Sequence, residues 1–485
     1  MEKIYVCHYD KKIDYPSSAE YFSPSVSYPE YPFFKVSNED NKIYDIVRNG
    51  LYRLGYDAAN FGKKNWNPLK EIIKQGDTVL LKPNWVMHEN PEKKYHDMEC
   101  LVTHPSFIRV MIDYVVIALK AVGGGRIILG DAPMAQCHFD ELIKKVHYDT
   151  LIEFYQEQGI NLEIKDLRGC TFDDNKNKFG VNNVTMSSEN EGVIVDVTKF
   201  SAFNDFSKEQ INSLKAPKLD PSKMRKHHTE NAHEYSIHKE ILAADVIINL
   251  PKPKSHRKAG MTACCKNFIG ANVRKDLLPH LTYGSIQEHG DAYQNPNILL
   301  TLSNICNEKY DYYTFQKKNR KAVLFRVLKG GFRRIGMKIS KEQFWEGSWY
   351  GNDTIWRTIS DVDNAIYYAD KNGILGNRHC RRIFSVCDMI IAGENEGPLS
   401  PTPKRLNTVI MSESHVSCID KFICRYIGFD EKLVKNINFL MTQEKIQTED
   451  IQIITDSQLY TYFTYPYSEE TKIRAGYGWH GYIEL

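Results

Sequence analysis

The sequence predicts an α/β fold, with mostly parallel sheets built from βα units and two irregular insertions. Short β-branched apolar runs at 78–81, 127–129 and 246–248 are typical of buried strands. Segments with apolar residues at helical spacing alternate with these runs, as at 106–121, which follows a proline. Strands that alternate with helices favour a parallel sheet.

The first half of the chain is expected to hold an arm, a lobe and an insertion. Residues 1–40 are rich in Tyr and Pro with little periodicity, which predicts an irregular N-terminal arm on the surface. Residues 41–160 are expected to form the first βα lobe, which includes helices over 40–54 and 141–158. Residues 161–235 are rich in Asn, Ser, Asp and Lys with short alternating runs, which is typical of a loop-rich or antiparallel insertion.

The second half is expected to continue the alternation around a second insertion. Residues 236–284 hold the central βα motif, and residues 285–350 form a basic insertion. Residues 351–485 are expected to form a C-terminal βα lobe. It begins with a helix over 351–370, and a strand over 408–411 belongs to its last βα pair.

The composition excludes several classes of protein. The 485 residues carry 63 Lys and Arg against 61 Asp and Glu, so bulk nucleic-acid binding is not indicated. The first residues lack the apolar core of a signal peptide, and no uninterrupted apolar stretch reaches the roughly 18 residues of a membrane span. We therefore expect a cytoplasmic protein. Its eleven cysteines show no framework spacing and no CxxC pair, so reduced and mostly buried thiols are expected.

The segment 244–270 carries the strongest functional signal. A buried strand leads into the run LPKPKSH at 250–256, whose two prolines forbid a helix and keep the chain extended. Side chains two apart share a face in an extended chain, so Lys252, Lys254 and His256 are expected to point the same way. The small residues that follow predict the start of a helix, whose free N–H groups would favour an anion beside the lysines.

Polar side chains also follow other predicted strands. Lys82 and Asn84 come after one strand, Asp131 after the next, and Glu394 and Glu396 after a strand in the C-terminal lobe. In open parallel sheets, ligands bind outside the carboxyl ends of the strands. If these strands share one sheet, their side chains would line a single pocket for a carboxylate or phosphate group.

The central segment resembles the characteristic motif of the DUF362 family (domain of unknown function 362), with Lys-x-Lys-x-His, a Gly and Thr, and then Lys-Asn and Gly. Further segments that resemble the family, in chain order, are LLKPNWV, THP, GDAP, RKHHTENAHEY, LPHLTYG, GNDTIWRT, GENEGPLSP and the C-terminal WHGYIEL. Some relatives carry a ferredoxin-type module, whose closely spaced cysteines this long form lacks. We therefore expect no iron–sulfur cluster.

The resemblance, taken with the residues above, predicts an enzyme acting by Lys/His acid–base chemistry. Long chains similar to this family but without the cluster module are expected beside bacterial surface-polysaccharide genes. This implies a sugar acid, sugar phosphate or lipid-linked sugar as the substrate and an isomerase, epimerase or transferase as the enzyme. The expected catalytic residues are Lys254, His256 and Lys266. The expected substrate-binding residues are Lys82, Asn84, Asp131, Lys252, Thr262, Asn267, Glu394 and Glu396.

A group of histidines allows a second interpretation. His227, His228 and His233, with Glu234 and His280, could hold a divalent metal. The protein would then be a metal-dependent hydrolase or redox enzyme. The spacing matches no established zinc signature such as HExxH, and histidines in polar loops more often form hydrogen bonds. The sequence leaves the cofactor open.

A basic segment allows a third interpretation. Residues 316–341 hold ten Lys or Arg and no acid, interleaved with apolar residues. Such a segment can lie on an anionic membrane surface, and the protein would then be a non-catalytic scaffold or an enzyme at the inner membrane face. The alternative is a solvated helix whose apolar side packs on the body of the protein.

Overall fold

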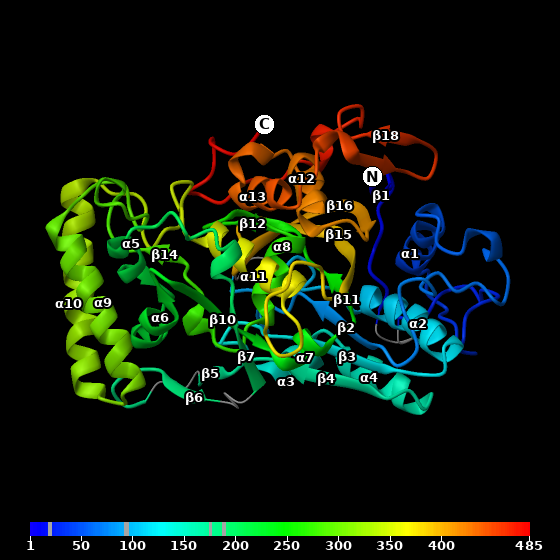
Figure 1. The fold of residues 1–485 in the computed structure, drawn as a ribbon, viewed down its shortest axis with the longest axis horizontal. Coiled ribbons are helices and arrows are strands. Elements are labelled where there is room, and N and C mark those ends of the chain that lie inside the picture. Colours follow the sequence, from blue (N-terminus) through cyan, green and yellow to red (C-terminus); the bar gives the residue numbers. More distant parts are fainter. Residues whose placement is uncertain (18–21, 92–96, 174–176, 187–190) are drawn as a thin grey trace.

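A mixed sheet of eleven strands runs through the centre of the molecule, and helices cover both of its faces (Figure 1). The computed structural model describes residues 1–17, 22–91, 97–173, 177–186 and 191–485. The strand order is β18-β17-β1-β16-β15-β11-β2-β3-β4, with β12 beside β15 and β13 beside β12. The predicted α/β class with a mostly parallel sheet is confirmed.

The centre of this sheet is parallel and buried on both faces. The strands are β1 (Glu2–His8), β2 (Thr78–Pro83), β3 (Arg126–Asp131), β4 (Leu162–Asp166), β11 (Val246–Leu250), β12 (Lys254–His256), β13 (Gly260–Thr262), β15 (Arg382–Glu396), β16 (Ser400–Ser412), β17 (Ile451–Ile454) and β18 (Leu459–Thr461). Successive side chains of a strand point to opposite faces. Leu80 therefore packs into the core on one side of the sheet, while Val79 and Leu81 pack on the other.

Two layers of helices complete the core. One face carries α1 (Lys42–Arg53), α2 (Pro105–Ala121), α3 (Phe139–Lys145) and α4 (Tyr148–Glu157). The opposite face carries α7 (Lys239–Ala243), α8 (Cys264–Asn267), α11 (Ile355–Tyr368), α12 (Val416–Tyr426) and α13 (Lys435–Gln443). A three-layer arrangement of this kind buries both sides of a parallel sheet, which explains the nearly continuous apolar runs of its central strands.

Local signals in the sequence set the helix boundaries on the first face. Pro105 occupies the first turn of α2, where its missing N–H costs nothing, and the His104 side chain accepts the N–H of Ser106. The single helix expected over 141–158 is two helices, because His147 adopts a left-handed backbone with φ of 60° and ends the first one.

The N-terminus and the last βα pair differ from the expectation. Residues 1–40 do not form only an irregular arm, because β1 lies inside the sheet between β17 and β16. The predicted strand over 408–411 is the end of the 13-residue β16, which pairs antiparallel with β15 as a long hairpin. Only the apolar parts of the two strands stand out in the sequence, so the polar ends that pair between Glu396 and Ser400 were not predicted.

The insertions form small antiparallel sheets and a helical hairpin. The small sheets contain β5 (Cys170–Asp173), β6 (Asn183–Met186), β7 (Gly192–Asp196), β8 (Leu214–Lys215), β9 (His228–Thr229), β10 (Ala232–His238) and β14 (Leu281–Thr282), with helices α5 (Lys208–Asn212) and α6 (Pro221–His227) nearby. The hairpin of α9 (Ile298–Phe315) and α10 (Asn319–Ser340) stands at one end of the molecule (Figure 1). Across the described ranges, every helix is too short or too polar to cross a bilayer.

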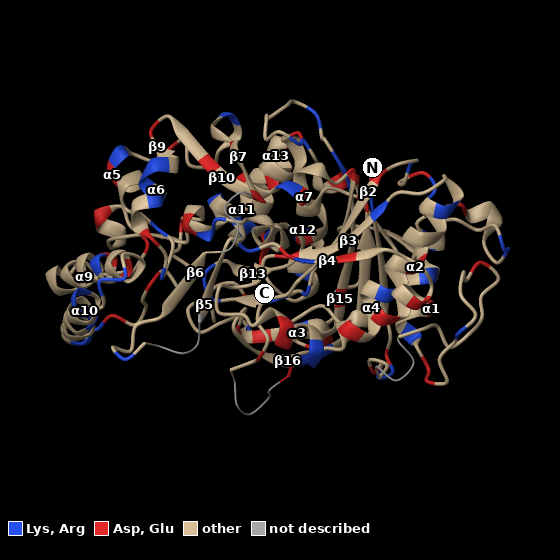
Figure 2. Ribbon diagram, turned by 90° about the horizontal axis from the view of Figure 1, so that it is seen from below, with Lys and Arg blue, Asp and Glu red and all other residues tan. Residues whose placement is uncertain are grey.

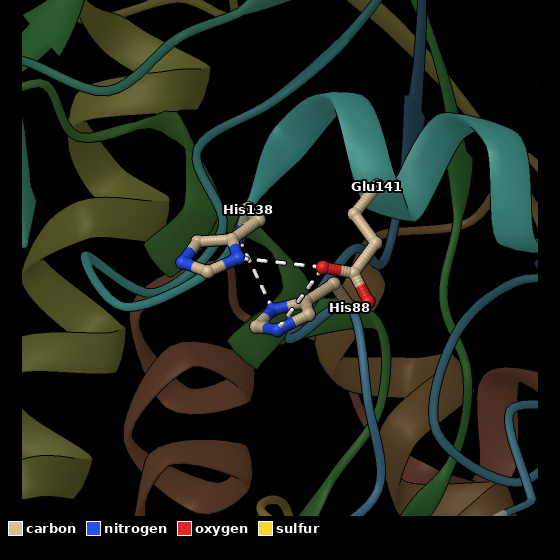
Figure 3. Close-up of side chains that lie close together, drawn as sticks. All are labelled: His88, His138 and Glu141. Atoms are coloured by element: carbon tan, nitrogen blue, oxygen red, sulfur yellow. Dashed lines mark hydrogen bonds and ion pairs between the residues drawn. The ribbon is translucent and has the colours of Figure 1, made fainter. Parts of the chain in front are cut away.

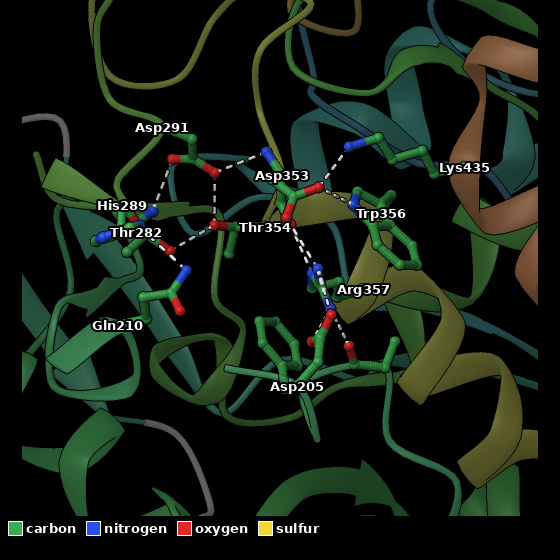
Figure 4. Close-up of polar contacts among 12 residues, drawn as sticks. Asp205, Gln210, Thr282, His289, Asp291, Asp353, Thr354, Trp356, Arg357 and Lys435 are labelled. Carbon is green, nitrogen blue, oxygen red and sulfur yellow. Dashed lines mark hydrogen bonds and ion pairs between the residues drawn. The ribbon is translucent and has the colours of Figure 1, made fainter. Parts of the chain in front are cut away.

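A polar cluster, buried around Asp291 and Thr354, joins the second insertion to α11 (Figure 4). The Asp291 carboxylate accepts hydrogen bonds from the Thr354 hydroxyl at 2.6 Å and the Asp353 N–H at 2.9 Å. Arg357 binds the carboxylates of Asp353 and Asp205. The GNDTIWRT motif therefore has a structural part in holding the insertion against α11.

Candidate functional site

A cavity of about 440 Å³ lies at the carboxyl ends of β2, β3 and β11. These strands are neighbours in the sheet, so the shared pocket expected from the sequence has a structural basis. Seven of the predicted site residues line it. They are Asn84, Asp131, Lys254, His256, Thr262, Lys266 and Asn267.

The central motif reaches the cavity as a β-hairpin and not as a strand followed by a helix. β12 and β13 pair antiparallel, with Lys254 opposite Thr262. The helix that follows, α8, has only four residues, and its first N–H groups at Cys264 and Cys265 donate to the carboxylate of Asp420 at 2.7 and 3.1 Å. This corrects the expectation of an anion site at a helix N-terminus, because Asp420 already occupies that terminus.

Lys254 is held in a geometry that suits a base. Its Nζ donates to the side-chain oxygen of Asn84 at 2.7 Å and to the backbone oxygen of Leu101 at 2.6 Å. Burial, followed by the nearby charge of Lys252, lowers the pKa of Lys254 to about 7. The two acceptors use both N–H bonds of the neutral amine, which leaves its lone pair free to accept a proton.

His256 is held as a neutral ring. Its Nδ1 accepts the backbone N–H groups of Lys258 at 3.1 Å and Ala259 at 3.0 Å, so a neutral ring carries its proton on Nε2. Burial, with the charge of Lys266 next in importance, lowers the pKa of His256 well below its usual range. The sequence predicted His256 as a group in acid–base catalysis. The structure instead favours a hydrogen-bond donor at Nε2.

Two further lysines line the cavity and were missed as individual site residues. Lys258 is buried, and its Nζ has no hydrogen-bond partner in the part of the chain that the structure describes. Lys275 donates to the backbone oxygen of Ala132 at 2.7 Å. Burial lowers the pKa values of Lys258, Lys266 and Lys275 to about 8. The signal was present in the sequence as seven Lys or Arg against one acid between residues 251 and 280.

Two asparagines form a chain of hydrogen bonds that ends at Lys254. Asn267 donates to the side chain of Asn249 at 2.8 Å and to the backbone oxygen of Lys82 at 3.1 Å. Asn84 donates to the side-chain oxygen of Asn267 at 3.2 Å and accepts from Lys254. Both asparagines line the cavity, where the sequence predicted contacts with substrate, and their hydrogen bonds also hold Lys254 in place.

The comparison with protein families agrees with these motifs. Residues 79–425 match the family model described as "Domain of unknown function (DUF362)". The chain belongs to the DUF362 family. No curated protein and no solved structure matches it. The residues that line the cavity, from Asn84 to Leu399, all fall within the matched DUF362 domain.

Lys82 lies next to the cavity of the DUF362 domain but does not line it. Its side chain is fully buried between β2 and β3, where Nζ binds Asp131 at 2.6 Å. Asp131 also accepts the N–H of Trp85 at 2.7 Å. This pair ties two neighbouring strand ends together, which differs from the substrate contact expected for Lys82.

Lys252 also lies away from the cavity. Its Nζ binds Asp388 at 2.9 Å and the Tyr15 hydroxyl at 2.7 Å, and both charged side chains are fully buried. The expected common face with Lys254 is lost because residues 251–253 lie between β11 and β12 and belong to neither strand. Strand alternation does not extend through them.

Glu394 and Glu396 are carried past the cavity by β15. This strand does not stop after its apolar part but continues for 15 residues beside β16. Glu394 accepts the backbone N–H of Arg474 at 3.0 Å, and Glu396 accepts that of Tyr477 at 2.6 Å. They hold the C-terminal segment, in place of the expected contact with substrate.

The histidines proposed as metal ligands are bound to other groups. His227 pairs with Glu234 at 2.7 Å. His228 contacts His233 at 3.3 Å through their Nδ1 atoms, and its Nε2 contacts the backbone oxygen of Leu277 at 2.9 Å. These described residues do not bring three ligand atoms within 4.8 Å of one another. His280 lies elsewhere, in the lining of the cavity.

A different group has the spacing of metal ligands, namely His88, His138 and Glu141 (Figure 3). The His88 Nδ1 accepts the backbone N–H of His138 at 3.1 Å, so the neutral His88 ring carries its proton on Nε2. That nitrogen faces Glu141 at 3.9 Å, and His138 Nδ1 lies 3.3 Å from the same carboxylate oxygen. A protonated Nε2 offers no lone pair to a metal, so this arrangement favours hydrogen bonding.

Proposed function

We propose that this DUF362 chain is an enzyme that binds an anionic metabolite in the cavity and moves a proton next to its charged group. The observation that carries the proposal is Lys258, whose buried Nζ has no hydrogen-bond partner in the described residues. A buried cation without an acceptor is costly to folding, and an anion in the cavity would supply the acceptor.

The surrounding charges support an anionic ligand. Lys254, Arg257, Lys258, Lys266 and Lys275 line the cavity. The acids in the lining are Asp131 and Glu346, and Asp131 is already paired with Lys82. The excess of cations in a partly closed space attracts a carboxylate or phosphate.

The groups around the cavity fit a proton transfer. The neutral amine of Lys254 takes a proton from the carbon next to a carboxylate or carbonyl group of the substrate. The His256 Nε2–H and the lysines then stabilise the negative charge that develops on oxygen. Return of the proton to the other face, or to the neighbouring carbon, gives an epimer or isomer. The proton returns to the same substrate and no acceptor for a transferred group is needed, so isomerase or epimerase chemistry is favoured over group transfer.

The size and charge of the cavity favour a small polar substrate. A volume of about 440 Å³ lies in the usual range for small-molecule sites. A sugar acid or a sugar phosphate, free or as the head of a lipid-linked sugar, has a matching charge and C–H groups beside electron-withdrawing oxygens. We propose these substrates, as used in surface-polysaccharide biosynthesis.

Hydrogen exchange tests this function directly. The purified protein is incubated in D₂O with a panel of hexuronic acids and hexose phosphates, and C–H signals are followed by proton NMR. We expect at least one of these compounds to lose a single C–H signal at a rate that depends on enzyme concentration. No exchange in any member of the panel would contradict the proposal.

Anion binding by Lys258 is a separate prediction. Lys258→Met is expected to weaken the binding of pyrophosphate by about 10- to 100-fold, since it removes one charge-assisted hydrogen bond. Isothermal titration calorimetry measures the change. The exposed Lys64→Met is the matched control, with unchanged affinity. Equal affinity in the Lys258 variant and the wild type would remove this residue from the site.

A further inference from the structure

The outer face of α10 is an apolar stripe that is open to solvent. Leu324, Val327, Ile335 and Ile339 are each more than half exposed, and Leu328 is partly exposed. Leu324, Leu328, Ile335 and Ile339 follow one another at intervals of four, seven and four residues, which places them on one side of a helix. Five aliphatic side chains on one open face are unusual for a solvated helix.

The inner face of α10 makes the contacts with the rest of the protein. Ala322 and Gly336 are its buried residues, and a Cβ at Gly336 would lie 2.8 Å from Leu300 of α9. Lys329 donates to the side chain of Asn307 at 2.6 Å, and Arg326 binds the backbone oxygen of Gly180. Phe325 stacks on Tyr313 of α9, and Met337 packs against the cluster that contains Leu300. The helix therefore packs through small, polar and a few apolar residues, and the exposed stripe lies outside these contacts. The inner apolar side chains of α10 are therefore covered, whereas the five aliphatic side chains of the stripe are not.

Exposed cations surround the apolar stripe. Four exposed cations adjoin it. Two of them, Arg320 and Lys321, precede the stripe in the sequence, and two, Arg334 and Lys338, lie beside its second half. The stretch 316–341 has no acid to neutralise them. In both overall views α10 forms an outer edge of the molecule (Figures 1 and 2), so this face is accessible to a large flat partner.

We propose that α10 binds an anionic lipid bilayer, lying in the plane of the membrane surface. An anionic bilayer satisfies both parts of the face, because its headgroups attract the cations and its acyl boundary takes up the aliphatic side chains. A nucleic acid would use the cations but leave the apolar stripe exposed. A second copy of α10 would bring together two stretches with ten cations each. This inference is independent of the chemistry in the cavity.

Co-sedimentation with vesicles tests the proposal. We expect the full-length protein to sediment with vesicles of phosphatidylcholine and phosphatidylglycerol, and to remain in solution with phosphatidylcholine alone. Added salt is expected to weaken the binding, because the surface attraction is screened.

Two variants separate the contributions of the face. L324Q/L328Q/I335Q removes the apolar stripe, and R320Q/K321Q/R334Q/K338Q removes the exposed charges. Each is expected to lower the vesicle partition coefficient by at least about tenfold. The matched control, K11Q/K12Q/K63Q/K64Q, removes four exposed lysines elsewhere and is expected to bind like the wild type. Circular dichroism and thermal melting show whether each variant is folded.

Vesicle binding by the wild type and the two α10 variants decides whether this face enters the membrane surface. Loss of binding in both folded α10 variants, with binding kept in the control, supports insertion of this face. Normal binding of L324Q/L328Q/I335Q would overturn the proposal, because the contact would then be simple charge adsorption. If the wild-type protein does not sediment with anionic vesicles, the proposal is also overturned, and an acidic protein groove would be indicated as the partner.

Discussion

Lys254→Met is expected to lower the rate of substrate hydrogen exchange in D₂O by about 10²- to 10⁴-fold, the usual contribution of a general base. The reason lies in the contacts of the amine. Asn84 and Leu101 hold Nζ through two hydrogen bonds, and burial brings the pKa of Lys254 to about 7. Methionine keeps much of the apolar stem but has no basic nitrogen. Proton NMR of the substrate signal measures the rate.

A second variant separates base catalysis from charge. Lys254→Arg keeps a cation in the cavity, but a guanidinium group does not release its proton at neutral pH. We expect this variant to bind pyrophosphate and to lack exchange activity, whereas Lys64→Met keeps both. Wild-type exchange in either Lys254 variant would exclude Lys254 as the base.

The same pKa values predict a bell-shaped pH dependence. Lys254 acts as a base only when deprotonated, so kcat/KM for exchange is expected to rise as the pH passes through about 7. Lys258, Lys266 and Lys275 bind the anion only when protonated, so their loss of charge above about pH 8 is expected to lower it again. A rate profile from about pH 6 to 9 tests both limbs. A rate that is flat across neutrality would contradict the assignment.

Much of the fold followed from local patterns in the sequence. The apolar runs before Lys82, Asp131 and Lys252 identified β2, β3 and β11, and their parallel pairing brings their ends to one edge of the sheet. That is why seven predicted residues reached the same cavity. The excess of cations in the central motif predicted an anion site, and several of these cations line the cavity, but the pattern did not single out Lys258 or Lys275.

The remaining differences come from contacts and backbone shapes that local patterns in the sequence do not show. Nothing near α8 in the sequence shows that Asp420 accepts the first N–H groups of this helix. Because these N–H groups are already bound, only side chains remain to attract the anion. Likewise, the length of β15 depends on its pairing with β16, and this pairing carries Glu394 and Glu396 past the cavity. Alternation rules apply only inside a strand, so they failed for Lys252 in the proline-rich link.

Lys252→Met is expected to lower the free energy of unfolding by about 3–5 kcal/mol, because it leaves the Asp388 carboxylate buried without its cation. Both side chains are fully buried, with Nζ and the carboxylate 2.9 Å apart. Asp388 keeps hydrogen bonds from the Tyr15 hydroxyl at 2.6 Å and the His104 N–H at 3.0 Å, but neither group carries a compensating positive charge. Urea denaturation followed by tryptophan fluorescence measures the loss.

The double variant Lys252→Met/Asp388→Asn identifies the cause of that loss. Asp388→Asn removes the carboxylate charge that Lys252→Met leaves unpaired, so much of the stability is expected to return. Replacing both members of a buried pair costs far less than removing one. Because Lys252 does not line the cavity, pyrophosphate affinity of the folded single variant is expected to stay close to that of the wild type. A stable Lys252→Met protein with lost anion affinity would reverse the assignment, and place Lys252 in the binding site that the sequence first suggested.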